Sequence, residues 1–208
     1  MRAPVPQPDP PWRGGNRFEI LADGHRFFPE MTRAIAGATE RVALEMYLAH
    51  SGPVATLFVD ALCDAAHRGV TVHVLIDDFG ARGLGRGDRD RLLAAGVHFA
   101  RFNPLSPLKL AWNLVRDHRK LLLIDDRLAF VGGAGLADEF GPGPAGGWRD
   151  NMMRIEGPCV GDWWAVFAAN WSRWSRVPCH APKAGTAGSS RGRALAGSLA
   201  GARAVKAA

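Results

Sequence analysis

Two side chains that could act on a phosphate ester, His118 and Lys120, lie two residues apart. They lead into the apolar run Leu121–Ile124, which predicts a buried strand, and side chains along a strand alternate between its two faces. An imidazole and a fixed positive charge are therefore expected to face the same way. Such a pair suits phosphoryl transfer without a metal, because the imidazole can attack phosphorus while the ammonium holds the phosphoryl oxygens.

The residues that follow extend this pair to the pattern H-x-K-x4-D-x6-G-G, which is completed by Asp125, Gly132 and Gly133. This spacing resembles the motif of the phospholipase D superfamily. Over residues 15–174 the chain also resembles bacterial cardiolipin synthases. The blocks that carry this likeness are Gly15-Asn16-Arg17, Leu44-Glu45-Met46-Tyr47, Ala66-His67-Arg68-Gly69-Val70, Arg101-Phe102-Asn103-Pro104, Ala137-Asp138-Glu139-Phe140 and Arg154-Ile155-Glu156-Gly157-Pro158.

The resemblance implies a phosphatidyltransferase of phospholipid biosynthesis that needs no metal or other cofactor. His118 would attack phosphatidylglycerol, release glycerol and form a phosphatidyl-histidine, and a second phosphatidylglycerol would then give cardiolipin. Lys120 would stabilise the phosphoryl oxygens, and Asp125 would orient its neighbours. The expected partners are anionic phospholipid and a membrane surface. The candidate substrate-binding residues are Gly132, Gly133, Glu45 and Arg119.

The chain departs from the family pattern in two respects. Gly135 stands where the superfamily places an Asn that helps to hold the phosphate, and its loss could remove roughly one to a few kcal/mol of transition-state stabilisation. Cardiolipin synthases also carry two motifs in one chain, whereas this chain has one. Either the motif is completed by a second copy or a second motif-bearing chain, or the sequence is half of a longer protein.

Charge and hydropathy narrow the class of partner. The net charge is +6, but the segment after Pro182 holds five basic residues and no acidic one, so residues 1–182 are nearly neutral. We therefore do not expect nucleic acid as the partner. No apolar run of about 18 residues predicts a transmembrane helix, and the Pro-rich start does not resemble a signal peptide. These features favour a peripheral protein on the cytoplasmic face of the cell membrane.

Hydrophobic periodicity predicts alternating strands and helices, hence an α/β fold: a phospholipase D-like domain with a mixed, mostly parallel sheet flanked by helices. We expect this domain at residues 16–181, after a Pro-rich extended segment (1–15) and before a disordered basic tail (182–208). The expected strands are 17–21, 42–47, 70–76, 97–102, 121–124, 128–131 and 151–155, and the expected helices are 27–36, 54–65, 88–95 and 161–174.

The segment before the motif allows two interpretations. It is apolar from Leu105 to Leu114 and contains Trp112, and the basic residues around the motif are Lys109, Arg116, Arg119, Lys120 and Arg127. It could dock onto an anionic bilayer, or it could form a helix packed on the core with solvated arginines. Glu45 lies inside an apolar strand, where a charge needs a partner.

Two alternatives to a lipid transferase remain open. The first is a homodimeric, single-motif phosphodiesterase that acts on nucleic acid, with water in place of the lipid hydroxyl. The second is an inactive, truncated half-domain that binds anionic lipid. Nuclease activity that depends on His118 would favour the first, and lipid binding that is indifferent to His118 would favour the second.

Overall fold

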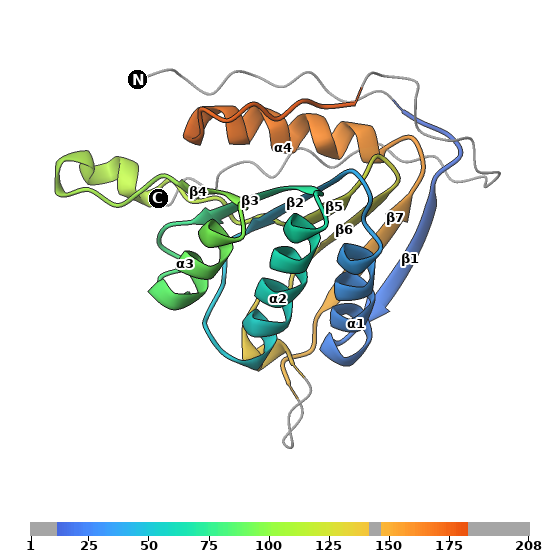
Figure 1. Cartoon of the computed structure of the whole chain (residues 1–208), viewed down its shortest axis with the longest axis horizontal. Coiled ribbons are helices and arrows are strands. Elements are labelled where there is room, and N and C mark those ends of the chain that lie inside the picture. Colours follow the sequence, from blue (N-terminus) through green and yellow to red (C-terminus); the bar gives the residue numbers. More distant parts are fainter. Residues whose placement is uncertain (1–11, 142–146, 183–208) are drawn as a thin grey trace.

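The computed structural model describes residues 12–141 and 147–182, which form one mixed sheet covered by helices on both faces (Figure 1). The strand order is β1-β7-β6-β5-β2-β3-β4. The strands are β1 Arg17–Ala22, β2 Arg41–Met46, β3 Thr71–Asp77, β4 His98–Phe102, β5 Lys120–Ile124, β6 Leu128–Gly132 and β7 Asn151–Glu156. The helices are α1 Gly24–Ala36, α2 Pro53–His67, α3 Arg86–Ala94 and α4 Val160–Trp174, with short 3₁₀ helices η1 Pro107–Leu114 and η2 Asp138–Phe140.

The mixed α/β architecture confirms the expected fold class, but the expectation of a mostly parallel sheet is wrong. Only the pairs β2–β3 and β3–β4 are parallel, and the other four neighbouring pairs are antiparallel. Parallel neighbours need a long crossover, and α2 and α3 provide one for each parallel pair. After β4 the strands follow one another without a long helix, so β5, β6 and β7 pair as antiparallel neighbours.

The two faces of the sheet bury separate hydrophobic clusters. Helices α1, α2 and α3 cover one face, and α4 lies across the other (Figure 1). Alternate residues of β5 divide between them: Leu122 and Ile124 pack toward α1–α3, whereas Leu121 and Leu123 pack toward α4. This alternation is the period of two expected of a strand that is buried on both faces.

The strand directions bring the motif residues to one end of the sheet, which we call the motif end. The pairings make β2, β3, β4 and β6 run one way and β5 and β7 the other. At this end of the sheet, the last residues of β2, β3, β4 and β6 therefore lie beside the first residues of β5 and β7. His118 and Lys120 stand at the start of β5, and Gly132 and Gly133 at the close of β6. Residues far apart in sequence thus share this edge.

The connection from β4 to β5 does not pack on the core as a helix, which was one of the two interpretations from sequence. It forms η1 and extends away from the sheet beside β4, at the far left of Figure 1. Most of the expected N-terminal segment (1–15) and tail (182–208) lies outside the described residues. No helix in the described part of the chain is long and apolar enough to cross a membrane.

Candidate active site

The side chains of His118 and Lys120 lie in direct contact at the motif end. The Nζ atom of Lys120 lies 2.9 Å from Nδ1 of His118 and donates to the backbone oxygen of His118 at 2.9 Å. Lys120 is 6 % exposed, whereas His118 is open to solvent. The ring of Tyr47 packs against the imidazole with ring centroids 4.4 Å apart. The histidine is therefore accessible and is held between a cation and an aromatic ring.

The surroundings favour the neutral form of this histidine. Partial burial of the ring lowers the pKa of His118 below its ordinary value of 6.5, and the positive charge of Lys120 lowers it further. Burial also lowers the pKa of Lys120, against the opposing charges of Asp150 and Asp117. A neutral imidazole keeps a lone pair available for attack, and this is the state that nucleophilic catalysis requires.

Gly132 and Gly133 lie where β6 ends next to the start of β5, and close neighbours there leave no room for a side chain. A Cβ atom on Gly132 would lie 2.3 Å from the backbone oxygen of Asn151, and one on Gly133 would lie 2.3 Å from Oδ1 of Asp150. Gly135 is equally crowded, since its Cβ would lie 2.8 Å from the backbone oxygen of Leu48. The Asn of the superfamily pattern would not fit at position 135 without a shift of the backbone.

Asp125, the third candidate catalytic residue, lies at the opposite end of β5, roughly 20 Å of strand away from His118. Its Oδ1 accepts from the backbone N–H groups of Glu40 at 2.9 Å and Arg41 at 3.1 Å, and Thr39 Oγ1 donates to its Oδ2 at 3.2 Å. Burial opposes ionisation, but these donors hold the pKa of Asp125 below its ordinary value. Its contacts thus orient the chain that enters β2 rather than the imidazole.

We therefore predict that Asp125→Ala has a much larger effect on the stability of the fold than on catalytic activity. The change leaves three backbone donors (Thr39, Glu40 and Arg41) and one hydroxyl without their acceptor, which is expected to cost about 2–4 kcal/mol of unfolding free energy. Urea unfolding measures this loss, and the specific activity of the folded fraction should stay within about threefold of the wild type. A folded variant that had lost its activity altogether would assign Asp125 a direct part in the reaction.

Glu45 and Arg119, two of the candidate substrate-binding residues, face α4 instead of the His118 side of the sheet. Arg119 Nε donates to Asp117 Oδ1 at 2.9 Å, and one of its Nη atoms lies 3.4 Å from Glu45 Oε1. Asn170 of α4 donates through Nδ2 to Glu45 Oε1 at 2.5 Å and to Asp117 Oδ2 at 2.8 Å. These four side chains form a polar cluster directly behind the motif, since Asp117 precedes His118.

The pKa values of the two carboxyl groups in this cluster shift in opposite directions, which indicates that the two groups hold one proton between them. Burial and the charge of Asp117 raise the pKa of Glu45 well above its ordinary value. The pKa of Asp117 is lowered, because hydrogen bonding with Glu45 and the charge of Arg119 outweigh its burial. Oε2 of Glu45 is buried without a hydrogen-bond partner among the described residues. A proton on this oxygen, donated toward Asp117, would satisfy both groups.

Two carboxylates at the motif end were not singled out from the sequence. Asp150 lies just before β7, against Gly133, and its charge raises the pKa of Lys120. Asp77, at the end of β3, accepts from the backbone N–H of Asp117 at 2.9 Å and so fixes the approach to His118. A signal was present, since both stand at ends of expected strands, but the strand order was needed to bring them to this edge.

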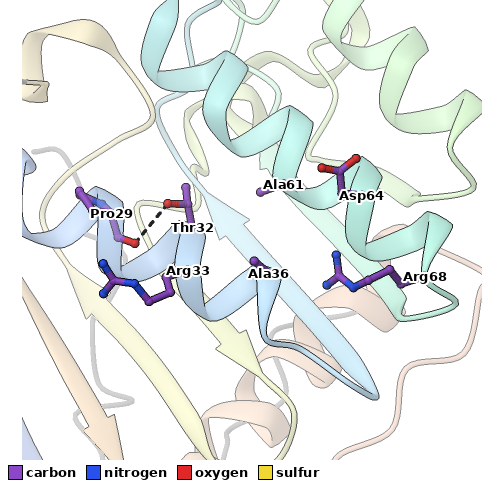
Figure 2. Close-up of a pocket in the computed structure, with 7 residues that line it drawn as sticks. All are labelled: Pro29, Thr32, Arg33, Ala36, Ala61, Asp64 and Arg68. Atoms are coloured by element: carbon purple, nitrogen blue, oxygen red, sulfur yellow. Dashed lines mark hydrogen bonds between the residues drawn. The ribbon is translucent and has the colours of Figure 1, made fainter.

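A separate surface groove of about 390 Å³ lies between α1 and α2 (Figure 2). It shares no residue with the motif; its walls are formed by Pro29, Thr32, Arg33, Ala36, Ala61, Asp64 and Arg68. It is therefore not where the histidine acts. The described residues contain no group of three or more His, Cys, Asp or Glu side chains that could hold a metal ion.

Comparison with known proteins identifies the family. Residues 31–139 match the family model described as the phospholipase D-like domain of cardiolipin synthase. The chain belongs to this family. Cardiolipin synthase B of Salmonella typhimurium is 38 % identical over 157 residues, 73 % of this chain and 37 % of the relative. The major cardiolipin synthase of Bacillus subtilis is 33 % identical over 183 residues, 83 % of this chain and 38 % of the relative.

Solved structures show the same fold at low sequence identity. The phospholipase D family member Nuc from Salmonella typhimurium has a TM-score of 0.58 at 16 % identity, over 78 % of this chain and 99 % of that chain. A phosphatidylserine synthase from Haemophilus influenzae has a TM-score of 0.60 at 15 % identity, over 72 % and 35 %. This chain thus spans less than half the length of the cardiolipin synthases it matches.

Proposed function

We propose that this domain transfers a phosphatidyl group through a covalent bond to His118, as one half of a cardiolipin-forming site. The observation that carries the proposal is the contact between an exposed imidazole with a lowered pKa and a buried lysine, at the motif end of a cardiolipin synthase-type domain. Because the relatives are cardiolipin synthases, we take phosphatidylglycerol to be both the donor and the acceptor.

The reaction proceeds as two displacements at phosphorus. In the first, a ring nitrogen of His118 forms a P–N bond and the bond to the glycerol oxygen breaks, so that glycerol leaves with a proton from a general acid. In the second, the hydroxyl of another phosphatidylglycerol attacks, loses its proton, and the P–N bond breaks to give cardiolipin. Dividing one difficult displacement in this way lowers each barrier.

Lys120 neutralises the phosphoryl oxygens as charge develops on them, and Asp150 keeps the ammonium oriented and charged. Because the backbone N–H of Gly133 already donates to the backbone oxygen of Asn151, the N–H groups of Ala134 and Gly135 take the place of the missing Asn amide. Glu45 and Arg119 act from behind, by holding Asp117 and with it the backbone at His118.

The general acid comes from a second motif. The chain supplies one motif, and its relatives are more than twice as long as the matched region. We propose a homodimer, or a pair with a second motif-bearing chain, in which the facing histidine protonates glycerol. Peripheral attachment to the cytoplasmic face of the membrane completes the proposal.

The deciding experiment incubates the full chain with phosphatidylglycerol in mixed micelles and follows cardiolipin and free glycerol, with His118→Ala in parallel. Equal amounts of both products, formed only by the wild type, support the transferase. DNA hydrolysis that is lost in His118→Ala, without lipid product, would replace it with a nuclease. Micelle binding without any product from either protein would identify a half-site that lacks its partner.

A further inference from the structure

The connection between β4 and β5 displays apolar side chains to solvent. Leu108 is 93 % exposed, Leu114 77 % and Trp112 44 %. With Leu105 and Val115, this connection holds five of the thirteen exposed large hydrophobic residues in the described part of the chain. Scattered exposed leucines need no explanation, but a cluster of this kind on one loop marks a contact surface. We call residues 104–115 the apolar loop.

The apolar loop is held in shape by polar contacts at its base. Asn103 Nδ2 donates to the backbone oxygens of Trp112 at 2.6 Å and Val115 at 2.9 Å. Ser106 and Asn113 bond to each other in both directions, at 3.2 Å and 2.7 Å. These contacts satisfy backbone groups that would be costly to move into an apolar medium. A loop fixed in advance also loses little conformational entropy when it binds.

The same base connects the loop to the reactive histidine. The chain passes from Val115 through Arg116 and Asp117 directly to His118. Arg116 donates to the backbone oxygen of Asn103 at 3.1 Å and pairs with Asp77 at 3.4 Å. Asp77 also accepts from the backbone N–H of Asp117. The same set of contacts therefore fixes the position of the loop and the position of His118.

A second element extends the apolar surface at the same end of the sheet. The backbone N–H of Leu105 donates to Asp78 Oδ2 at 2.8 Å, which places the loop beside the turn after β3. The next residue, Phe79, is 43 % exposed, and the guanidinium of Arg82 lies 4.4 Å from its ring centroid. An aromatic ring under an arginine suits a boundary between apolar and polar media.

The charge pattern indicates what this surface contacts. Residues 104–115 contain no acidic residue, and Arg82 stands on the neighbouring turn. A second copy of the chain would bring the same apolar and basic groups and no acid from this loop to meet them. An anionic lipid surface offers both an apolar interior and negative headgroups, and apolar residues flanked by basic ones enter such interfaces.

We propose that the apolar loop inserts Leu108 and Leu114, its two most exposed side chains, into an anionic phospholipid bilayer. The insertion holds His118 at the level of the phosphodiester headgroups and leaves the body of the domain in water. This inference rests on the proposed function, because it takes the membrane lipid to be the substrate that His118 attacks.

The test is sedimentation of the full chain with vesicles of phosphatidylcholine and phosphatidylglycerol. Leu108→Ser combined with Leu114→Ser is expected to lower the partition coefficient by about 100-fold, roughly tenfold for each leucine withdrawn from the bilayer. The matched control changes two leucine-sized residues exposed elsewhere, Ile20 (62 % exposed) and Leu93 (54 % exposed), to serine and should stay within twofold of the wild type.

Two further arms separate this inference from the proposed function. His118→Ala should bind vesicles as the wild type does. The double loop variant should cleave the soluble diester bis(p-nitrophenyl) phosphate at the wild-type rate while losing activity on vesicles. Such a result shows that the loop delivers the enzyme to lipid and takes no part in the chemistry.

Unchanged vesicle binding by the double loop variant overturns the inference, whatever the protein does to phosphodiesters. A fall in its mass by light scattering, with vesicle binding retained, assigns the loop to a contact between copies and also overturns it. Vesicle binding that depends on the loop in a protein that processes no phosphodiester supports the surface and contradicts the proposed function.

Discussion

Replacing Lys120 with methionine is expected to lower kcat on phosphatidylglycerol by about 100- to 1,000-fold. The ammonium lies 2.9 Å from the imidazole in a largely buried position, where a charge that stabilises the phosphoryl oxygens is worth far more than it is in water. Methionine keeps most of the length and the apolar stem and removes the ammonium, with its charge and its hydrogen bond to the backbone oxygen of His118. The loss should therefore appear in kcat, whereas vesicle binding should stay unchanged.

The same variant should also change the pH dependence. Lys120 lowers the pKa of His118, so removal of its charge raises that pKa toward the ordinary value. The reaction needs the neutral ring, so the rate falls as the pH drops through the pKa of His118. The acidic limb of the wild type is expected below pH 6.5, and that of Lys120→Met at a higher pH than the wild type's.

The pH-rate profile of residual activity and an NMR titration of the imidazole, assigned with His118→Ala, measure this shift. Lys120→Arg is the matched control, because it retains the charge and should keep the pKa of His118 low. If the methionine variant titrated like the wild type, the two side chains would not be in electrostatic contact in solution.

Asp117→Ala is expected to lower the free energy of unfolding by about 3–5 kcal/mol. The change leaves Arg119 with less compensation for its charge and removes an acceptor from Asn170 inside a buried cluster, which is the costly way to break an ion pair. It also removes the residue beside His118 that anchors this backbone from behind. Urea unfolding at pH 7 measures the loss.

Glu45→Gln is the informative companion to this variant. If Glu45 already carries a proton, the amide replaces a neutral group of the same shape and should cost less than about 1 kcal/mol. A raised pKa means that Glu45 supports the fold at low pH and that this support is lost as the pH rises through its folded pKa. The glutamine variant lacks this loss, so its stability relative to the wild type should improve with rising pH. A cost of several kcal/mol at neutral pH would contradict the neutral form of Glu45.

The sequence was sufficient to predict the individual strands and helices and the placement of His118 beside Lys120. Apolar periods of two and of three to four residues placed the strands and helices to within a few residues, because burial on a sheet or helix face repeats along the chain. The pair at His118 and Lys120 followed from the same alternation, which needs no knowledge of neighbouring strands. The structure brings these two side chains into contact, as expected.

What depended on pairing between strands could not be obtained in this way. Asp125 shares the motif with His118, but six residues of extended chain separate them, and only the contacts with Thr39, Glu40 and Arg41 reveal what its carboxylate holds. The face on which Arg119 lies follows from alternation, since Arg119 stands between the reactive pair in sequence, but its ion pair with Glu45 depends on the pairing of β5 with β2. The mostly parallel sheet was inferred from the first four strands alone.

The pairing of β1 with β7 has a consequence for how the chain acquires its structure. Arg17 lies opposite Glu156, so β1 finds its strand partner only after some 140 further residues have been made. Closing a loop of that length is slow, and among the described strands β1 has no other neighbour in the sheet. The remaining strands can assemble before this edge is added. During synthesis, β1 can pack against the adjacent α1, but it must remain without its strand partner until nearly the whole domain has left the ribosome.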